Sequence, residues 1–245
     1  MPYYDAFVIP VPTANKDKFI HHARTIDAIF IENGATRVVE CWGDDVAHGK
    51  VTDFYRAIGA KEDETVALAW IEWPDRATRD RGIAATMDPD NPDPRADPAQ
   101  NPMPFDGRRM IFGGFDPLVS RGDHSSLPYV QGFMVPVPTA RREAYAEMAA
   151  GGWDMFIGQG ALALLEAWGD DVPHGAVTDF YRGVNATEDE SVVFSYMIWP
   201  SKAVCQQAAT AMEQMEMPED FHMPFDGMRM VWGGFEPVVL LEASR

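Results

Sequence analysis

Hydrophobic and polar positions recur along the chain with two periods, and these periods predict strands and helices in a regular order. Aromatic and β-branched residues at 3–11 predict a strand that ends in a proline-rich turn. Apolar residues at helical spacing follow, and Gly34 ends the helix they predict. Pro74 suits the first turn of a second helix. Further apolar runs predict strands at 35–42, 65–73 and 109–115. The order is β-α-β-β-α-β, the ferredoxin-like split unit.

The whole pattern occurs twice, which indicates a tandem duplication. Residues 3–13 (YYDAFVIPVPT) return as 129–139 (YVQGFMVPVPT), and residues 40–56 return as 166–182 with few changes, both 126 positions later. A second motif, beginning MPFDG, returns near the end of each half after 120 positions. A fixed internal offset of this kind is the signature of a repeated structural unit.

The duplication predicts three parts of the chain: a first ferredoxin-like repeat at 1–119, a linker at 120–128 and a second repeat at 129–245. One four-stranded sheet with both helices on one face leaves its other face uncovered. A second copy in the same chain can cover that face. We therefore expect an α+β fold in which two βαββαβ repeats pack as an α/β barrel with a pseudo-twofold axis.

The segment 43–64 has no clear periodicity, although it is long for a connection inside a compact unit. Segments of this length usually carry function or a short element of their own. We expect a short element at 52–56.

Several motifs resemble those of an uncharacterised bacterial family, the YbaA-like proteins. They are FVIPVP near the start, ECWGDDV, KEDET, and MPFDG with the glycine pair that follows it. The resemblance covers nearly all of each copy and implies a ferredoxin-like fold of the dimeric α/β barrel type. It implies no activity and no catalytic residue. Members are usually single-copy chains that dimerise, and many have Phe-Pro-Arg where this chain has Phe54-Tyr55-Arg56.

Composition and charge exclude several classes of partner. The 245 residues carry a formal net charge of −18, and acidic residues outnumber basic ones in both halves. Phosphate-backbone and anionic-membrane binding need clustered basic residues, so we expect neither nucleic acid nor membrane as a partner. The start of the chain lacks a signal-peptide pattern, which favours a cytoplasmic protein. Two cysteines, Cys41 and Cys205, are too few for a disulfide scaffold, and we expect both to be reduced.

Glu40 and Glu166 are the sharpest candidates for catalysis, because each interrupts an apolar strand at a matched position. A buried carboxylate needs a partner, or its pKa rises and it becomes a potential general base. Arg109 or Arg56 could be the partner of Glu40, with Arg229 or Arg182 for Glu166. A structural ion pair or a solvent-facing edge position is the alternative.

His48 and His174 are further catalytic candidates, since each follows a pair of aspartates in a matched motif, such as Asp44-Asp45 in the first copy. Carboxylates and imidazole could hold a divalent metal, but glycine-flanked turn chemistry explains the motif as well. The spacing matches no established metal motif, so we expect no metal. Candidate ligand-binding residues are Trp42, Arg56, Trp168 and Arg182, with core packing or ion pairing as the alternative.

Two functional hypotheses follow. In the first, the barrel binds an apolar small molecule, or acts on it without a cofactor, through the residues above. In the second, the protein is non-catalytic and its polar motifs only shape turns and the contact between the copies. The repeats would form an intramolecular pseudo-dimer, and a homodimer of the whole chain stays open.

Overall fold

The computed structural model describes residues 1–215 and 222–244. The first repeat comprises β1 (Tyr3–Pro12), α1 (Lys16–Glu32), β2 (Arg37–Asp45), α2 (Phe54–Ala57), β3 (Glu64–Trp73), α3 (Arg76–Thr86) and β4 (Ile111–Gly122). The second comprises β5 (Tyr129–Pro138), α4 (Arg142–Gly151), α5 (Trp153–Gly158), β6 (Ala163–Asp171), α6 (Phe180–Gly183), β7 (Glu190–Trp199), α7 (Lys202–Glu213) and β8 (Val231–Glu242). Short 3-10 helices lie at Thr13–Asn15, Pro94–Ala96, Gly107–Arg109, Thr139–Arg141 and Gly227–Arg229. The predicted order of elements is confirmed in both repeats.

Element boundaries differ from the predictions by a few residues, and two of the differences have a clear local cause. The fourth strand begins at Ile111, because Arg109 belongs to a 3-10 turn, and the strand runs on to Gly122. The short element expected at 52–56 is α2, whose start is fixed by the Asp53 carboxylate accepting the Arg56 backbone N–H at 2.8 Å.

The eight strands close into one antiparallel barrel in the order β1-β3-β2-β8-β5-β7-β6-β4. Each repeat contributes four neighbouring strands, and the two seams between repeats are the pairs β2–β8 and β4–β6. Both seams contain register shifts, one of them directly after Glu40. The predicted pseudo-twofold barrel is therefore confirmed, and the last strand of each repeat joins the sheet of the other. The division at 1–119 and 129–245 stays a proposal, but the predicted linker at 120–128 is shorter than expected, because residues 120–122 belong to β4.

Large side chains fill the barrel interior. Trp70 and Tyr196 stack at the centre with their ring centroids 4.5 Å apart. The short helices α2 and α6 contact each other and insert Phe54 and Phe180 into the same core. Two cross-repeat hydrogen bonds hold these helices, including one of 2.7 Å from the Thr52 hydroxyl to the Gly183 carbonyl. The two repeats thus share one interior core.

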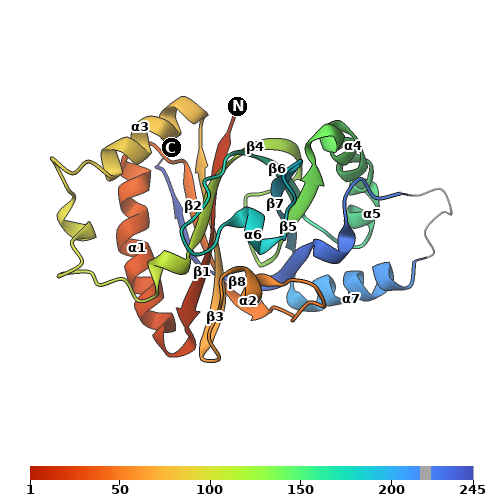
Figure 1. Cartoon of the computed structure of the whole chain (residues 1–245), viewed down its shortest axis with the longest axis horizontal. Helices are drawn as coiled ribbons and strands as arrows, with labels where there is room; N and C mark the ends of the chain where they lie inside the picture. Colours follow the sequence, from red (N-terminus) through yellow and green to blue (C-terminus); the bar gives the residue numbers. More distant parts are fainter. Residues whose placement is uncertain (216–221, 245) are drawn as a thin grey trace.

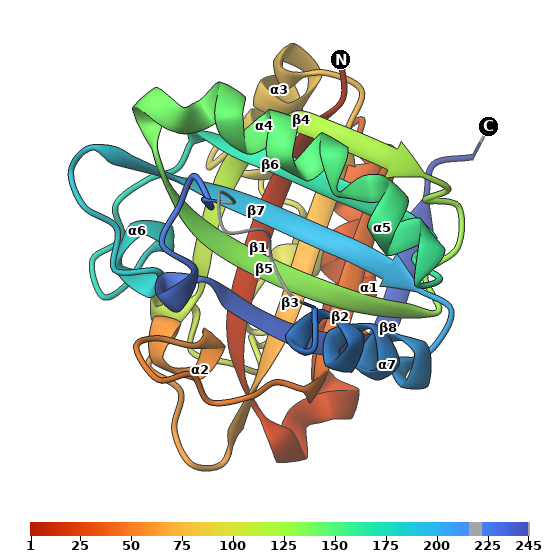
Figure 2. The same ribbon diagram turned by 90° about the vertical axis from the view of Figure 1, so that its right-hand side faces the viewer.

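Helices cover the outside of the barrel in two separate layers (Figures 1 and 2). α1 and α3 form one layer on the strands of the first repeat, where α1 also packs on β8, and α4, α5 and α7 form the other on the strands of the second, where α4 also packs on β4. The counterpart of α1 is divided into α4 and α5 at the pair Gly151-Gly152, since glycine is a poor helix former. None of the helices in the described ranges has the length and apolar character needed to span a membrane.

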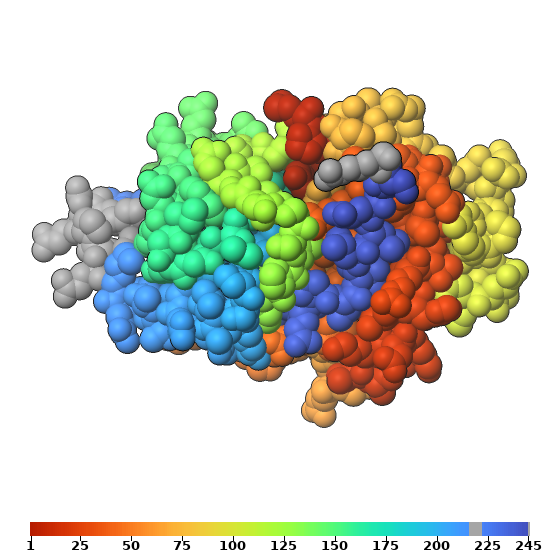
Figure 3. Space-filling view, turned by 180° about the vertical axis from the view of Figure 1, so that it is seen from behind, coloured from red at the N-terminus to blue at the C-terminus, as the bar shows by residue number. Residues whose placement is uncertain are grey.

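The connection between the repeats crosses the back of the molecule beside the end of β8 (Figure 3, yellow-green beside dark blue). The Arg37 guanidinium donates a 2.5 Å hydrogen bond to the His124 carbonyl in this connection. The Asp123 backbone N–H donates to the Leu162 carbonyl at 2.9 Å. The connection is therefore attached to both repeats.

Candidate functional site

Glu40 and Glu166 lie at matched places on β2 and β6, between the sheet and the helices that cover it. Glu40 shares its strand face with Val38 and Trp42, which pack under α1 in the outer core of the first repeat. Each glutamate is only 7% exposed. Both glutamates are therefore buried and do not hold the solvent-facing edge position that was the alternative, and both belong to the helix–sheet layers outside the barrel interior.

The partner predicted for Glu40 was wrong. Its charged neighbour is Asp27 of α1, a second buried carboxyl group. Glu40 Oε2 and Asp27 Oδ2 have no hydrogen-bond partner among the described residues. Burial and the Asp27 charge raise the pKa of Glu40 well above its ordinary value, and burial also raises the pKa of Asp27. The first repeat thus contains a pair of carboxyl groups that favour the protonated form.

Glu166 is held differently from Glu40. The Tyr145 hydroxyl on α4 donates a 2.7 Å hydrogen bond to Glu166 Oε2. Burial raises the pKa of Glu166 to about 7, although hydrogen bonds from Tyr145 and Ser195 favour the charged form and partly offset the shift. At the positions matching Tyr145 and Ser195, the first repeat has Phe19 and Ala69. The matched carboxyl groups therefore lie in different polar surroundings.

The arginines proposed as partners of these glutamates make structural ion pairs elsewhere. Arg109 forms two hydrogen bonds with the Glu64 carboxylate, of 2.6 and 2.7 Å. Arg229 pairs with Glu190 in the same way at the matched place in the second repeat. The Arg229 side chain lowers the pKa of Glu190 to about 2. Both pairs join the first residue of the third strand of a repeat to the turn before its fourth strand.

Arg56 and His48 lie together in the turn around α2. Arg56 donates a 2.6 Å hydrogen bond to the Gly49 carbonyl and lies 3.3 Å from the Asp53 carboxylate. The His48 ring packs on Tyr55 with a centroid distance of 4.7 Å, and its side chain is 75% exposed. The structure does not bring these residues to Glu40, which lies beneath α1.

The same arrangement recurs in the second repeat. Arg182 donates to the Gly175 carbonyl at 2.6 Å, and the His174 ring packs on Tyr181 at 4.9 Å. In both copies these contacts are the ones expected if the motif stabilises a glycine-flanked turn.

Trp42 and Trp168 lie in the same layers as the glutamates. Trp42 is 6% exposed and packs against Phe19 of α1 with the ring centroids 5.9 Å apart. Trp168 is 8% exposed, and the Arg142 guanidinium lies over its ring at 5.6 Å. Of the four ligand-binding candidates, the two tryptophans are the ones that share a layer with Glu40 and Glu166.

The aspartates before His48 take part in the seam between the repeats and not in a shared site with the histidine. Asp44 accepts a 3.1 Å hydrogen bond from the Tyr129 hydroxyl and lies 2.8 Å from the Lys202 ammonium group. Asp170 has the matching partners, Tyr3 and Arg76. Across residues 1–215 and 222–244, no three His, Cys, Asp or Glu side chains converge as metal ligands.

Asp27 and Tyr145, the polar neighbours of the two glutamates, were not predicted from the sequence. A signal for Asp27 was present, because it falls four residues after Ala23 on the buried stripe of its helix. A charged residue at such a position suggests a buried polar partner. Tyr145 follows the ordinary pattern of an apolar helix face, and only the strand opposite shows what its hydroxyl contacts.

The closed strand order, and the pairing of each repeat's last strand with the second strand of the other repeat, define the class of protein, a dimeric α/β barrel folded within one chain. A family model described as "Protein of unknown function (DUF1428)" matches residues 2–107 and 128–227. The chain belongs to this family. The two matched segments correspond to its two repeats.

Known relatives agree with this assignment. The uncharacterized protein YbaA of Escherichia coli (strain K12) is 44% identical over 119 residues, which cover 49% of this chain and 98% of YbaA. Among solved structures, an anthrone oxidase-like protein has a TM-score of 0.56 at 13% identity, with 100% of this chain and 94% of that chain covered. A monooxygenase candidate from Fusobacterium nucleatum has a TM-score of 0.54 at 9% identity, with 98% and 94% covered. At these identities the two structures show the fold alone.

Proposed function

We propose that this protein binds an apolar small molecule between a sheet and its covering helices, with Glu40 and Glu166 as the polar groups that orient it. The observation that carries the proposal is a pair of buried carboxyl oxygens, Glu40 Oε2 and Asp27 Oδ2, that have no hydrogen-bond partner within residues 1–215 and 222–244. Buried polar groups are nearly always hydrogen-bonded, so a buried carboxyl oxygen without a partner needs an explanation. A polar atom of a ligand would supply the missing contact.

The chemistry of the site follows from the raised pKa values. A carboxyl group that stays protonated near neutral pH can donate a hydrogen bond to a carbonyl or hydroxyl oxygen. In its deprotonated form it can accept a proton from the same molecule. Trp42 and Trp168 lie beside the two glutamates and offer flat apolar surfaces for the rest of the ligand. The proposal therefore predicts a mainly apolar molecule with one oxygen function.

A non-catalytic role is the second candidate, and a separate observation favours it. Large side chains fill the barrel interior, and Tyr145 already gives Glu166 a hydrogen bond within the protein. On this hypothesis the glutamates are structural, and the polar motifs only stabilise turns and the seams. The two candidates differ in what should occupy the space near Glu40.

Native mass spectrometry of the purified protein tests the proposal. We expect a co-purifying small molecule whose occupancy falls in Glu40→Gln and Glu166→Gln, since an amide cannot exchange a proton as a carboxyl group does. Glu62→Gln and Glu188→Gln are matched controls, because they make the same change at exposed positions of the two repeats. Protein of apo mass would contradict the proposal if, in addition, a panel of aromatic ketones and phenols gave no saturable NMR shifts.

A further inference from the structure

The second repeat contains an open cavity of about 420 Å³ between α7 and the strands β5 and β8. Its volume lies in the ordinary range for small-molecule sites. The residues that line it include Asp45, Tyr129, Gln131, Cys205, Glu213 and Trp232. Asp45 comes from β2, so both repeats contribute to the cavity. Neither Glu40 nor Glu166 lines it, and the cavity is independent of the site proposed above.

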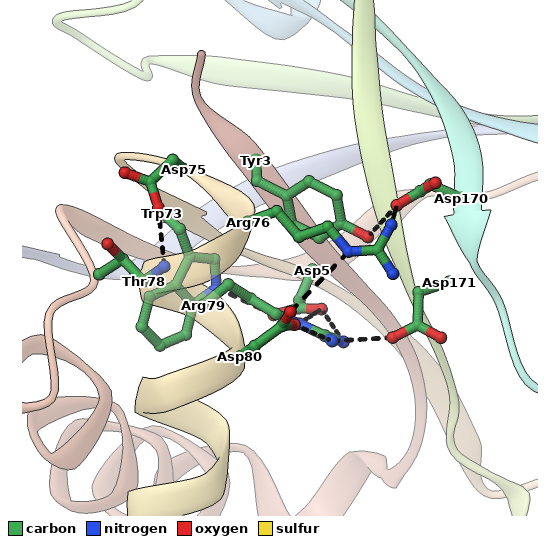
Figure 4. Close-up of polar contacts among 10 residues, drawn as sticks. All are labelled: Tyr3, Asp5, Trp73, Asp75, Arg76, Thr78, Arg79, Asp80, Asp170 and Asp171. Carbon is green, nitrogen blue, oxygen red and sulfur yellow. Dashed lines mark hydrogen bonds and ion pairs between the residues drawn. The ribbon is translucent and has the colours of Figure 1, made fainter.

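The matched place in the first repeat is filled by the side chain of Arg79 on α3 (Figure 4). Its guanidinium donates to the Asp5 carboxylate, with the shortest contact at 2.7 Å, and to Asp171 at 2.8 Å. It also lies over the ring of Tyr3, 5.7 Å from the centroid. Two carboxylates and an aromatic face therefore hold one guanidinium group at this seam.

The second repeat keeps the tyrosine and one of the two carboxylates of this framework, and it lacks the guanidinium. Cys205 stands 126 residues after Arg79, and Gln131 stands 126 residues after Asp5. Trp199 donates to Gln131 at 3.1 Å, just as Trp73 donates to Asp5 at 2.9 Å in the first repeat. The backbone frame is matched as well, because Asp5 pairs with Gly114 and Gln131 pairs with Gly234. Replacing a long arginine by a short cysteine leaves space where the charged group would lie.

The groups around this space favour a positive charge. Asp45 occupies the position of Asp171, and Glu213 adds a second carboxylate at the end of α7. Among the described residues that line the cavity, none is a lysine or arginine. Lys202, on the same helix, is paired with Asp44 at 2.8 Å. Tyr129 and the partly exposed Trp232 offer aromatic faces, which attract organic cations.

We propose that this cavity binds a small organic cation whose guanidinium or ammonium group takes the place that the Arg79 guanidinium holds in the first repeat. Asp45, whose Oδ2 also accepts a 2.8 Å hydrogen bond from the Gln206 amide, pairs with the charge, and the aromatic rings of Tyr129 and Trp232 contact its apolar part. The short side chain of Cys205 leaves room for the cation, and its thiol does not react.

Titration calorimetry of the whole chain with butylguanidinium tests the proposal. Butylamine tests the other cationic head group, and butanoate tests the opposite charge on a chain of similar size. We expect saturable binding of one or both cations and none of butanoate. Cys205→Arg should supply the missing guanidinium from within and weaken cation binding by at least about tenfold, whereas Cys205→Ala keeps the space and the affinity.

Asp45→Asn provides a second variant that leaves the cavity volume unchanged. It should weaken cation binding by about tenfold or more, because the main carboxylate is lost. The proposal is overturned if neither cation binds, if butanoate binds equally well, or if Cys205→Arg and Asp45→Asn both bind like the unaltered chain. Since Glu40→Gln and Glu166→Gln alter neither Asp45 nor Cys205, they should leave this binding unchanged.

Discussion

The Tyr145 hydroxyl lies 2.7 Å from Glu166 Oε2, and this hydrogen bond crosses from the helix layer to the sheet of the second repeat. In the first repeat the matched residue is Phe19, and Glu40 faces the Asp27 carboxyl group instead. Duplication thus placed a carboxyl group at the same buried position twice, and the two copies surround it differently. One copy supplies a donor, and the other supplies a second acid.

Glu166→Gln should remove a pH dependence from the stability of the fold. The pKa of Glu166 is raised from 4.5 to about 7 in the folded chain. The group's contribution to stability is therefore fully present below pH 4.5 and is lost as the pH rises through about 7. This loss amounts to about 3 kcal/mol. Urea unfolding at pH 4.5 and pH 8 should show the variant gaining up to that amount relative to the unaltered chain at the higher pH.

Glu188→Gln is the control for this effect, because it removes an exposed carboxylate from the same repeat. Its unfolding free energy should follow that of the unaltered chain at both pH values. If Glu166→Gln also followed the unaltered chain, Glu166 would ionise with an ordinary pKa and could not be a protonated donor at neutral pH.

Tyr145→Phe should raise the pKa of Glu166 above 7. The hydroxyl donates to the carboxylate and so favours its charged form, while burial opposes that form. Without this hydrogen bond, less of the pKa increase caused by burial is offset. Carbon-13 NMR of the glutamate side chains would report the titration, with Glu166→Gln used to assign the signal. An unchanged or lower pKa in Tyr145→Phe would show that the hydrogen bond does not persist in solution.

The fold of this molecule could be predicted from the sequence, because the order of its strands and helices depends on patterns that repeat. Hydrophobic periodicity located the strands, and the offset between Tyr3 and Tyr129 indicated two like units that had to cover each other. The same periodicity showed that Glu40 interrupts an apolar strand. Each of these signals can be seen in a single segment of the sequence, or by aligning the two copies with each other.

The contacts of the candidate residues could not be predicted in the same way. Arg109 was proposed as a partner of Glu40, yet it pairs with Glu64, the first residue of the third strand. That choice depends on which turns meet in space, and sequence spacing alone does not show it. The helical spacing could have indicated that Asp27 is buried, but not that it faces Glu40, which lies on another element. The cavity beside Cys205 became visible only when matched positions of the two repeats could be compared in three dimensions.

Arg109→Met should destabilise the first repeat strongly. It removes both hydrogen bonds to Glu64, whose side chain is only 3% exposed, and leaves a buried carboxylate without its cation. Breaking a buried pair from one side costs about 3 kcal/mol. Chemical unfolding measures this cost directly. Arg108→Met makes the same change at a side chain that is 84% exposed, and it should cost less than about 1 kcal/mol. Equal effects of the two substitutions would show that the Glu64–Arg109 pair does not form.

Cutting the chain between Ser125 and Ser126 should show that the repeats depend on each other. β2 pairs with β8 and β4 with β6, so an isolated half exposes two unpaired strand edges. Co-expressed halves should therefore purify together as a one-to-one complex. Residues 1–125 alone should dimerise, because their own β2 can replace the matched β6 beside the β4 of a second copy. Light scattering after gel filtration measures both masses. A stable monomer of either half would show that the seams are dispensable, and the uncut chain gives the reference mass.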